Sequence, residues 1–115
     1  MGETIYKILP ASLWADAVAA GSFRGSSLDL ADGYIHFSTA SQVSGTAAKY
    51  FEGQKGLFLV AVDSDVLGDA LRWEPSRGGQ LFPHLYAELD FDAVISVTDL
   101  PLRSDGSHTI PDLKP

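Results

Sequence analysis

The chain has 115 residues, no cysteine and a formal net charge of −7, with a sequence pI of about 4.6. Without cysteine, neither a disulfide framework nor a zinc site with thiolate ligands can form. Only eight residues are basic and they form no run, which opposes binding to nucleic-acid phosphates, and no apolar stretch approaches the roughly 20 residues of a membrane span.

A hydrophobic content of 45% predicts a folded chain, and the length predicts one domain over residues 1–115. We expect its core to run from about residue 5 to 100, with an irregular tail over about 101–115. The N-terminal residues lack the basic and apolar regions of a signal peptide, which favours a cytoplasmic protein without nucleic-acid or membrane partners.

The first elements in chain order are a strand over Ile5–Leu9 and a helix over about Leu13–Ala20. Ser12 is a plausible N-cap for this helix, and Gly21 fits the position just past its end. Its apolar stripe would consist of Leu13, Trp14, Ala17 and Val18.

Ser22–Asp32 is rich in small polar residues and is predicted to be a loop. Such loops are mostly connectors, but they can also bring backbone N–H groups and a hydroxyl such as that of Ser27 close to a phosphate or ribose. Gly33–Thr39 follows as a strand with an apolar face and a polar face. The polar face would carry Tyr34, His36 and Ser38.

Thr39 and Gln42 match a capping box at the start of a second helix, predicted over about Ala40–Phe51, and Gly53 can close it. We interpret both residues first as caps. A helix N-terminus beside His36 also suits an anionic ligand group, so Thr39 is a candidate ligand contact as well.

The second half of the chain predicts a central buried strand, a single helical turn and three further strands. Their ranges are 57–62, 64–68, 70–74, 82–88 and 93–97. In the strand over 82–88, His84, Tyr86 and Glu88 share one face. Two of the three histidines of the chain therefore lie on polar strand faces, and we predict that His36, Ser38, His84 and Tyr86 line one pocket.

The motifs Gly33-Tyr-Ile-His-Phe-Ser-Thr39 and Phe82-Pro-His-Leu-Tyr86, with Tyr6 in a first strand, resemble a bacterial family known as domain of unknown function 952. The resemblance spans about residues 5–100. It implies membership of the ADP-ribosyltransferase fold group: an α+β fold of two small, packed, mainly antiparallel sheets with two main helices and a central cleft, which holds NAD in related enzymes.

The resemblance also implies roles for individual residues. Tyr6 and Lys7 occupy the first-motif strand, although many family members have histidine where this chain has Lys7. His36, His84 and an acidic residue would be catalytic, with Glu74 the first choice and Glu88 an alternative. The expected contacts to NAD are Tyr6, Lys7, Ser27, Ser38, Thr39 and Tyr86.

Three function classes follow from these residues. The first is binding or cleavage of NAD or a related nucleotide, in which a carboxylate stabilises the positive charge that develops on the ribose. The second is a non-catalytic small-ligand or partner-binding module on the same scaffold. The third is a metal-dependent hydrolase using His36, His84 and a carboxylate, although the sequence has no ligand pair at helical spacing to support a metal. No cofactor is firmly implied, and NAD is expected as a substrate.

Overall fold

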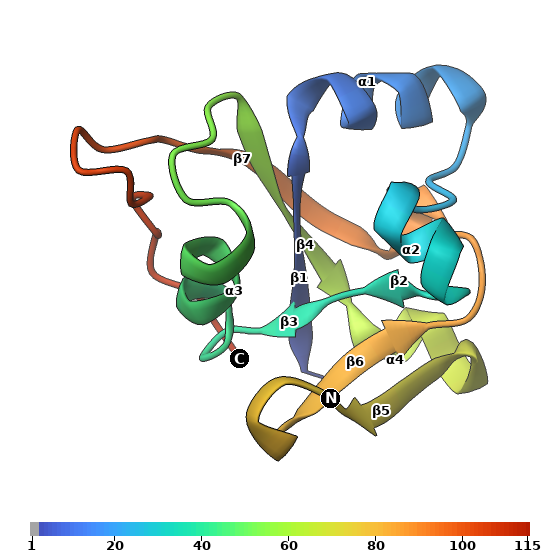
Figure 1. The fold of residues 1–115 in the computed structure, drawn as a ribbon. Helices are drawn as coiled ribbons and strands as arrows, with labels where there is room; N and C mark the ends of the chain where they lie inside the picture. The colour runs from blue at the N-terminus through green and yellow to red at the C-terminus, as the bar shows by residue number, and fades with distance from the viewer. Residues whose placement is uncertain (1–2) are drawn as a thin grey trace.

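Two antiparallel sheets organise residues 3–115, the part of the chain that the computed structural model describes (Figure 1). One sheet has the strand order β3-β1-β4-β7 and the other has the order β2-β6-β5. The strands are β1 (Thr4–Pro10), β2 (Ile35–His36), β3 (Ser38–Thr39), β4 (Leu57–Asp63), β5 (Leu71–Pro75), β6 (Leu81–Leu85) and β7 (Val94–Leu100). The helices are α1 (Ala11–Ala20), α2 (Ser27–Asp32), α3 (Val43–Tyr50) and α4 (Ser64–Leu67), with short 3₁₀ turns at Gly68–Ala70, Arg77–Gly79 and Phe91–Ala93. The α+β class with two mainly antiparallel sheets is as predicted.

The central strand of the larger sheet is β4, which pairs with β1 on one side and β7 on the other. Its sequence is almost continuously apolar, and Val60 and Val62 are fully buried. A strand covered on both faces needs apolar side chains on both, so the prediction of a buried central strand is confirmed.

The predicted strand over 33–39 is one extended segment that contributes to both sheets. Ile35 and His36 pair with β6, whereas Ser38 and Thr39 pair with β1. Between them, Phe37 is buried and its N–H donates to the carbonyl of Pro83. The segment therefore ties the two sheets together, and the expected polar face is divided between them.

The helices differ from the prediction in three ways. Helix α1 begins at Ala11 with Pro10 in the N-cap position rather than Ser12, and Val18 is 56% exposed rather than part of the buried stripe. Gly21 does end α1 in the left-handed conformation. Helix α4 is the predicted single turn, whereas α2 was not predicted and occupies part of the expected loop.

At the start of α3, only half of the predicted capping box forms. The Gln42 side chain accepts a hydrogen bond from the Thr39 N–H, but the Thr39 hydroxyl contacts Ser41 instead of the Gln42 N–H. The helix begins at Val43 and ends at Tyr50, so it is shorter than predicted and stops before Gly53.

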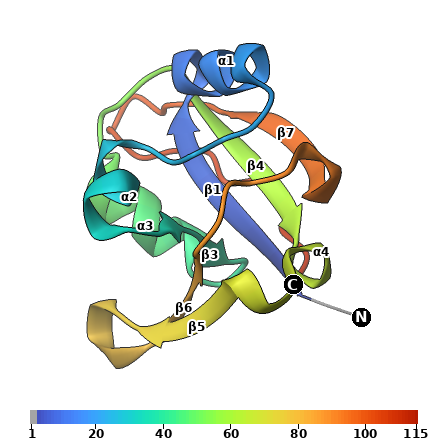
Figure 2. The ribbon, with the colours of Figure 1, turned by 90° about the vertical axis from the view of Figure 1, so that its right-hand side faces the viewer.

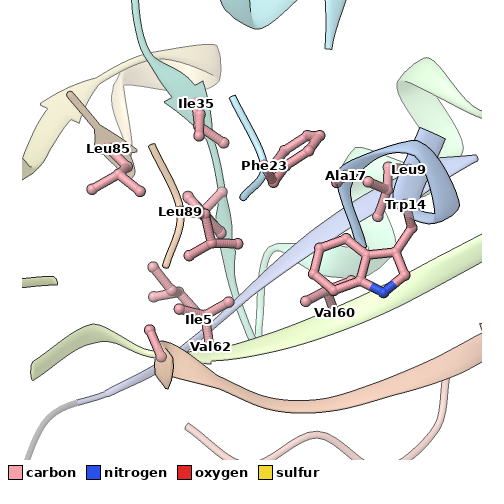
Figure 3. Close-up of a cluster of buried hydrophobic side chains, with 12 residues drawn as sticks. Ile5, Leu9, Trp14, Ala17, Phe23, Ile35, Val60, Val62, Leu85 and Leu89 are labelled. Atoms are coloured by element: carbon pink, nitrogen blue, oxygen red, sulfur yellow. The ribbon is translucent and has the colours of Figure 1, made fainter. Parts of the chain in front are cut away.

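The space between the two sheets is filled by a hydrophobic core (Figure 3). Ile5, Val60 and Val62 come from the larger sheet, and Ile35 and Leu85 come from the smaller one. The predicted central cleft is therefore wrong in position, because packed apolar side chains hold the sheets together there.

A second core lies on the other face of the larger sheet, beneath α3. Ile110 and Leu113 pack against it, and the Tyr6 hydroxyl donates to the carbonyl of Lys114 at 2.6 Å. The tail beyond residue 100 forms no regular strand, as predicted, but it covers this core. No helix in the described range is long and apolar enough to cross a membrane.

Candidate functional site

The pairing of β2 with β6 brings the two strand histidines together. His36 and His84 are direct cross-strand partners, and their ring centroids lie 5.5 Å apart, edge to face. Tyr34 stacks on His84 with centroids 4.1 Å apart, and Tyr86 lies 5.2 Å from Tyr34. We call Tyr34, His36, His84 and Tyr86 the histidine–tyrosine cluster.

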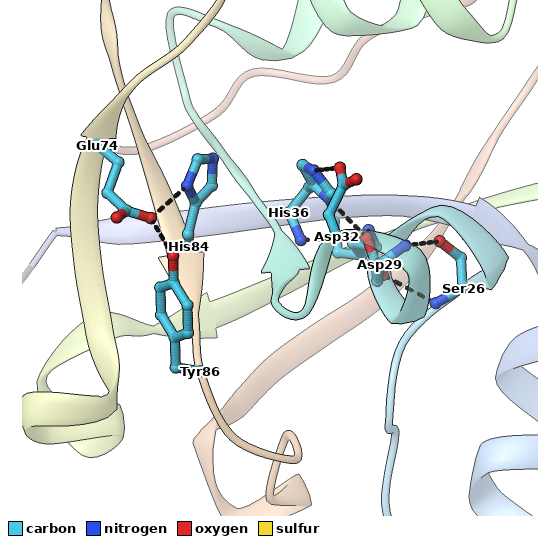
Figure 4. Close-up of polar contacts among 8 residues, drawn as sticks. Ser26, Asp29, Asp32, His36, Glu74, His84 and Tyr86 are labelled. Atoms are coloured by element: carbon cyan, nitrogen blue, oxygen red, sulfur yellow. Dashed lines mark hydrogen bonds and ion pairs between the residues drawn. The ribbon is translucent and has the colours of Figure 1, made fainter.

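Glu74 on β5 orients His84. Its Oε1 lies 2.9 Å from Nδ1 of His84 and accepts a hydrogen bond of 2.7 Å from the Tyr86 hydroxyl (Figure 4). Nε2 of His84 has no hydrogen-bond partner among the described side chains. Nε2 of His84 is not fully buried. Among the described side chains, Nδ1 of His108 is the one nitrogen or oxygen that is both fully buried and without a hydrogen-bond partner. When Nδ1–H donates to Glu74, neutral His84 presents a free acceptor at Nε2.

His36 is held on both sides by α2. Its Nδ1 lies 2.6 Å from Asp29 and its Nε2 lies 2.9 Å from Asp32 (Figure 4). Carboxylates only accept hydrogen bonds, so both contacts form at once only when both ring nitrogens carry protons. His36 is therefore fully engaged within the protein, in contrast to His84.

Asp29 is the buried centre of this arrangement, with a side chain that is 1% exposed. It accepts hydrogen bonds from the N–H groups of Ser26 and His36 and pairs with Nζ of Lys7 at 2.9 Å. Burial by itself would raise the pKa of Asp29, but the His36 ring, the Lys7 charge and the Ser26 N–H together hold that pKa well below its usual value. Asp29 is therefore a carboxylate in the folded protein.

The surroundings of Tyr34, Glu74 and Tyr86 shift the pKa values of all three side chains. The hydrogen bond to Glu74 raises the pKa of Tyr86, and hydrogen bonds from Tyr86 and His84 lower the pKa of Glu74. Burial and the charges of Asp32 and Glu74 raise the pKa of Tyr34. Both tyrosines thus stay neutral hydrogen-bond donors at neutral pH.

A pocket of about 340 Å³ lies beside the cluster, between α2 and the segment that follows β6. Tyr34 and Tyr86 belong to its wall, together with an Arg24–Glu88 ion pair of 2.6 Å. This volume is at the lower end of the range for small-molecule sites. Of the four residues predicted to line one pocket, Tyr86 lines this one, and His36 and His84 adjoin it through their ring contacts with Tyr34, at 4.7 and 4.1 Å between centroids.

Several predicted ligand contacts have structural partners. The Ser38 hydroxyl bonds to that of Thr46 on α3, and the Thr39 N–H is capped by Gln42. Lys7 is buried against Asp29, and Tyr6 is bound to the tail. These residues therefore use their polar groups to stabilise the fold around the site.

The two remaining predicted residues lie near the pocket. Ser27 is the first residue of α2, next to the Ser26 cap. Glu88 lines the pocket but is paired with Arg24, whereas Glu74 contacts His84 directly. The geometry favours Glu74 over Glu88 as the acidic residue of the cluster.

Sequence reasoning missed the residues of α2. Asp29 and Asp32 fell inside the segment predicted as a loop, yet they hold both nitrogens of His36. A signal was present, because Ser26 and Asp29 form a capping box in which each side chain accepts from the other's N–H. The Ser-x-x-Asp spacing could have predicted this helix start.

No group of three or more histidine, aspartate or glutamate side chains in the described range could hold a metal ion. The metal-dependent hydrolase alternative thus has no ligand set to rest on in residues 3–115.

Comparison with known proteins identifies the family of the chain and a relative whose structure has been solved. Residues 8–97 match the family described as protein of unknown function (DUF952). The crystal structure of protein CC0527 from Caulobacter crescentus is 50% identical, covers 92% of this chain and 93% of its own, and superposes with a TM-score of 0.89. Its solution NMR structure is 51% identical over 90% of both chains, with a TM-score of 0.81. No curated protein matches the chain.

Proposed function

This chain belongs to the DUF952 family, and we propose that its histidine–tyrosine cluster binds NAD or a related nucleotide through His84. The observation that carries the proposal is the environment of His84. Its side chain is 4% exposed, Glu74 holds Nδ1, and Nε2 has no partner among the described residues. A histidine held in this way can exchange a proton or a hydrogen bond with a ligand.

The choice of a nucleotide rests on the aromatic wall and on the sequence resemblance. Tyr34 and Tyr86 offer ring surface beside the pocket, and such surface can stack on a planar base or on nicotinamide. The motifs that carry His36 and His84 resemble the DUF952 family, and through it the ADP-ribosyltransferase fold group, for which two packed antiparallel sheets are expected. The finer fold assignment is part of this proposal.

If the ligand is cleaved, the bond between ribose and nicotinamide breaks and nicotinamide leaves with the bonding electrons. The positive charge that develops on the ribose would be stabilised by Glu74, and the acceptor hydroxyl or water would give its proton to Nε2 of His84. His36 has no proton-transfer role in this scheme, because both of its nitrogens face carboxylates.

A non-catalytic binding module is the second candidate. It is favoured by the engagement of Glu74, whose Oε1 already accepts hydrogen bonds from both His84 and Tyr86. These bonds spread the charge of the carboxylate and weaken its effect on a developing cation.

Thermal unfolding with NAD, ADP-ribose and nicotinamide, together with an assay for nicotinamide release, tests the proposal. We expect a ligand to raise the melting temperature of the wild type, because it binds only the folded state. Glu74→Gln should lose this shift, whereas Glu52→Gln, which changes an exposed carboxylate in the turn between α3 and β4, should keep it.

Nicotinamide release by the wild type that is lost in Glu74→Gln would assign an enzyme. Stabilisation without release would assign the binding module. No stabilisation by any of the three compounds at millimolar concentration would contradict the proposed function.

A further inference from the structure

The pocket beside the histidine–tyrosine cluster is bordered by two chain segments that are fixed to each other. The segment between α1 and α2 meets the segment after β6 in a backbone bridge (Figure 2). In this bridge, Phe23 and Leu89 each donate an N–H to the carbonyl of the other, at 3.3 and 2.8 Å, and both side chains are buried. Arg24 and Glu88 are the chain neighbours of the bridge and line the pocket. Their backbones are therefore held in place beside it.

Arg24 is the single positive charge among the described residues that line the pocket. Two carboxylates, those of Asp29 and Glu88, belong to the wall as well. The charge of Asp29 is compensated inside the protein, because Nζ of Lys7 lies 2.9 Å from it and Nδ1 of His36 lies 2.6 Å from it. The charge of Arg24 is therefore balanced by Glu88, and this wall becomes positive when the Glu88 side chain moves away.

The contact between Arg24 and Glu88 is short but exposed. Nε of Arg24 lies 2.6 Å from Oε1 of Glu88, and the two side chains are 77% and 54% exposed. An ion pair in contact with water contributes little to stability, because each charge is well solvated without the other. Ser22 adds only a long hydrogen bond of 3.4 Å to the same oxygen. Another anion can thus replace Glu88 at small cost and without a change in the backbone.

Arg72 is the other arginine near the cluster, but it lies outside the pocket wall. Its guanidinium carbon is 4.9 Å from the centroid of the Tyr86 ring, in a cation–π contact. An anionic group of a ligand in the pocket therefore meets Arg24 first.

We infer that Arg24 binds a phosphate group of the nucleotide and that Glu88 occupies the guanidinium until the phosphate replaces it. The inference rests on the proposed function and names the part of the ligand that this wall recognises. Tyr34 and Tyr86 would contact the planar ring of the ligand, and Arg24 the phosphate next to its ribose. A terminal phosphate carries a charge of about −1.5 to −2 near pH 7 and binds a guanidinium through two parallel hydrogen bonds, so it competes well with one carboxylate.

Nicotinamide mononucleotide and nicotinamide riboside differ by one phosphate, and calorimetric titration with both tests the inference. Arg24→Gln should lower the affinity for the mononucleotide about tenfold and thereby lower the ratio of the two affinities, because charge-assisted hydrogen bonds are lost. Glu88→Gln should raise the affinity for the mononucleotide by up to about fivefold, because the competing carboxylate is removed. Arg103→Gln is the matched control at an exposed arginine in the tail, and its affinities should equal those of the wild type.

The outcomes separate this inference from the proposed function. Equal affinity ratios in Arg24→Gln and Arg103→Gln would overturn the inference and leave the proposed function standing. If the wild type binds neither compound, the proposed function fails, and inorganic pyrophosphate then decides the inference. A saturable shift of the Arg24 Nε–H signal in NMR spectra, reached at lower pyrophosphate concentration in Glu88→Gln, would support the anion site, and no shift would overturn it.

Discussion

At the scale of single residues, the Lys7–Asp29 ion pair controls the surroundings of His36. Both side chains are at least nine-tenths buried, and their nitrogen and oxygen lie 2.9 Å apart. Burial lowers the pKa of Lys7, and the Asp29 charge counteracts this. Lys7 therefore acts on the site through Asp29, and its position explains why an ammonium is tolerated there.

Removing the ammonium should be costly. Lys7→Met keeps much of the side-chain volume but leaves the Asp29 carboxylate buried without its cation, which we expect to lower the free energy of unfolding by about 3–5 kcal/mol. Urea titration measures this loss. Lys55→Met, at an exposed lysine, is the control, and a loss no larger than that of the control would contradict the prediction.

The depressed pKa of Asp29 also predicts a dependence of stability on pH. A carboxyl group whose pKa is lower in the folded state stabilises the fold fully above its unfolded pKa of about 3.9 and loses that contribution as the pH falls toward the folded value. The difference in unfolding free energy between wild type and Asp29→Asn should therefore shrink steadily below about pH 4. Urea titrations across this range measure it, and a constant difference would refute the assignment.

Alternation along the strands was enough to put His36, His84 and Tyr86 on polar strand faces, because side-chain direction in a strand has a fixed period of two. The choice of Glu74 came from the family resemblance, and the structure places it against His84. The same reasoning could not find the partners of His36. Asp29 and Asp32 reach it from a six-residue helix, and Asp29 pairs with Lys7, which is 22 residues earlier in the chain.

At the scale of elements, α2 depends on a close approach at Gly25. A Cβ built there would lie 2.7 Å from Cβ of Asp29, and Gly25 has a φ of +121°. Gly21 also has a positive φ, of +91°, but a Cβ there would meet nothing within 4 Å. An alanine would therefore adopt an unfavourable φ at either position, but only at position 25 would its Cβ also clash with a neighbouring side chain.

Gly25→Ala should destabilise the protein more than Gly21→Ala by about 1–3 kcal/mol, the usual cost of forcing extra volume into a packed site. It should also shift the NMR signal of the His36 amide, which donates to Asp29. Denaturation and NMR spectra of both variants provide the test. Equal losses would show that Asp29 moves away without cost.

Elements with a strong local signal were predicted well. The apolar run of β4 and the glycine that ends α1 are examples, because a long buried strand and a left-handed C-cap each require particular residue types. Helix α2 is too short for periodicity to show. The division of residues 35–39 between two sheets depends on which strands lie beside them, which local sequence does not encode.

At the scale of the whole molecule, the tail is part of the fold. Leu113 packs against the core beneath α3, and the Lys114 carbonyl binds Tyr6. Leu113→Ala should therefore lower the free energy of unfolding by about 1–2 kcal/mol, in proportion to its partial burial. Leu28→Ala, at a leucine that is 56% exposed on α2, should change it by less than about 0.5 kcal/mol. Similar losses in chemical denaturation would mean that the tail does not stabilise this core.

The segment over 35–39 has a consequence for how the protein opens. Its backbone bonds to β6 at one end and to β1 at the other, so neither sheet can come apart without disturbing the other. The amide protons of β1 and β6 should consequently exchange with deuterium through one shared, global opening, with equal protection free energies and equal sensitivity to denaturant. Faster exchange confined to β6 would reveal instead that the smaller sheet melts as an independent unit.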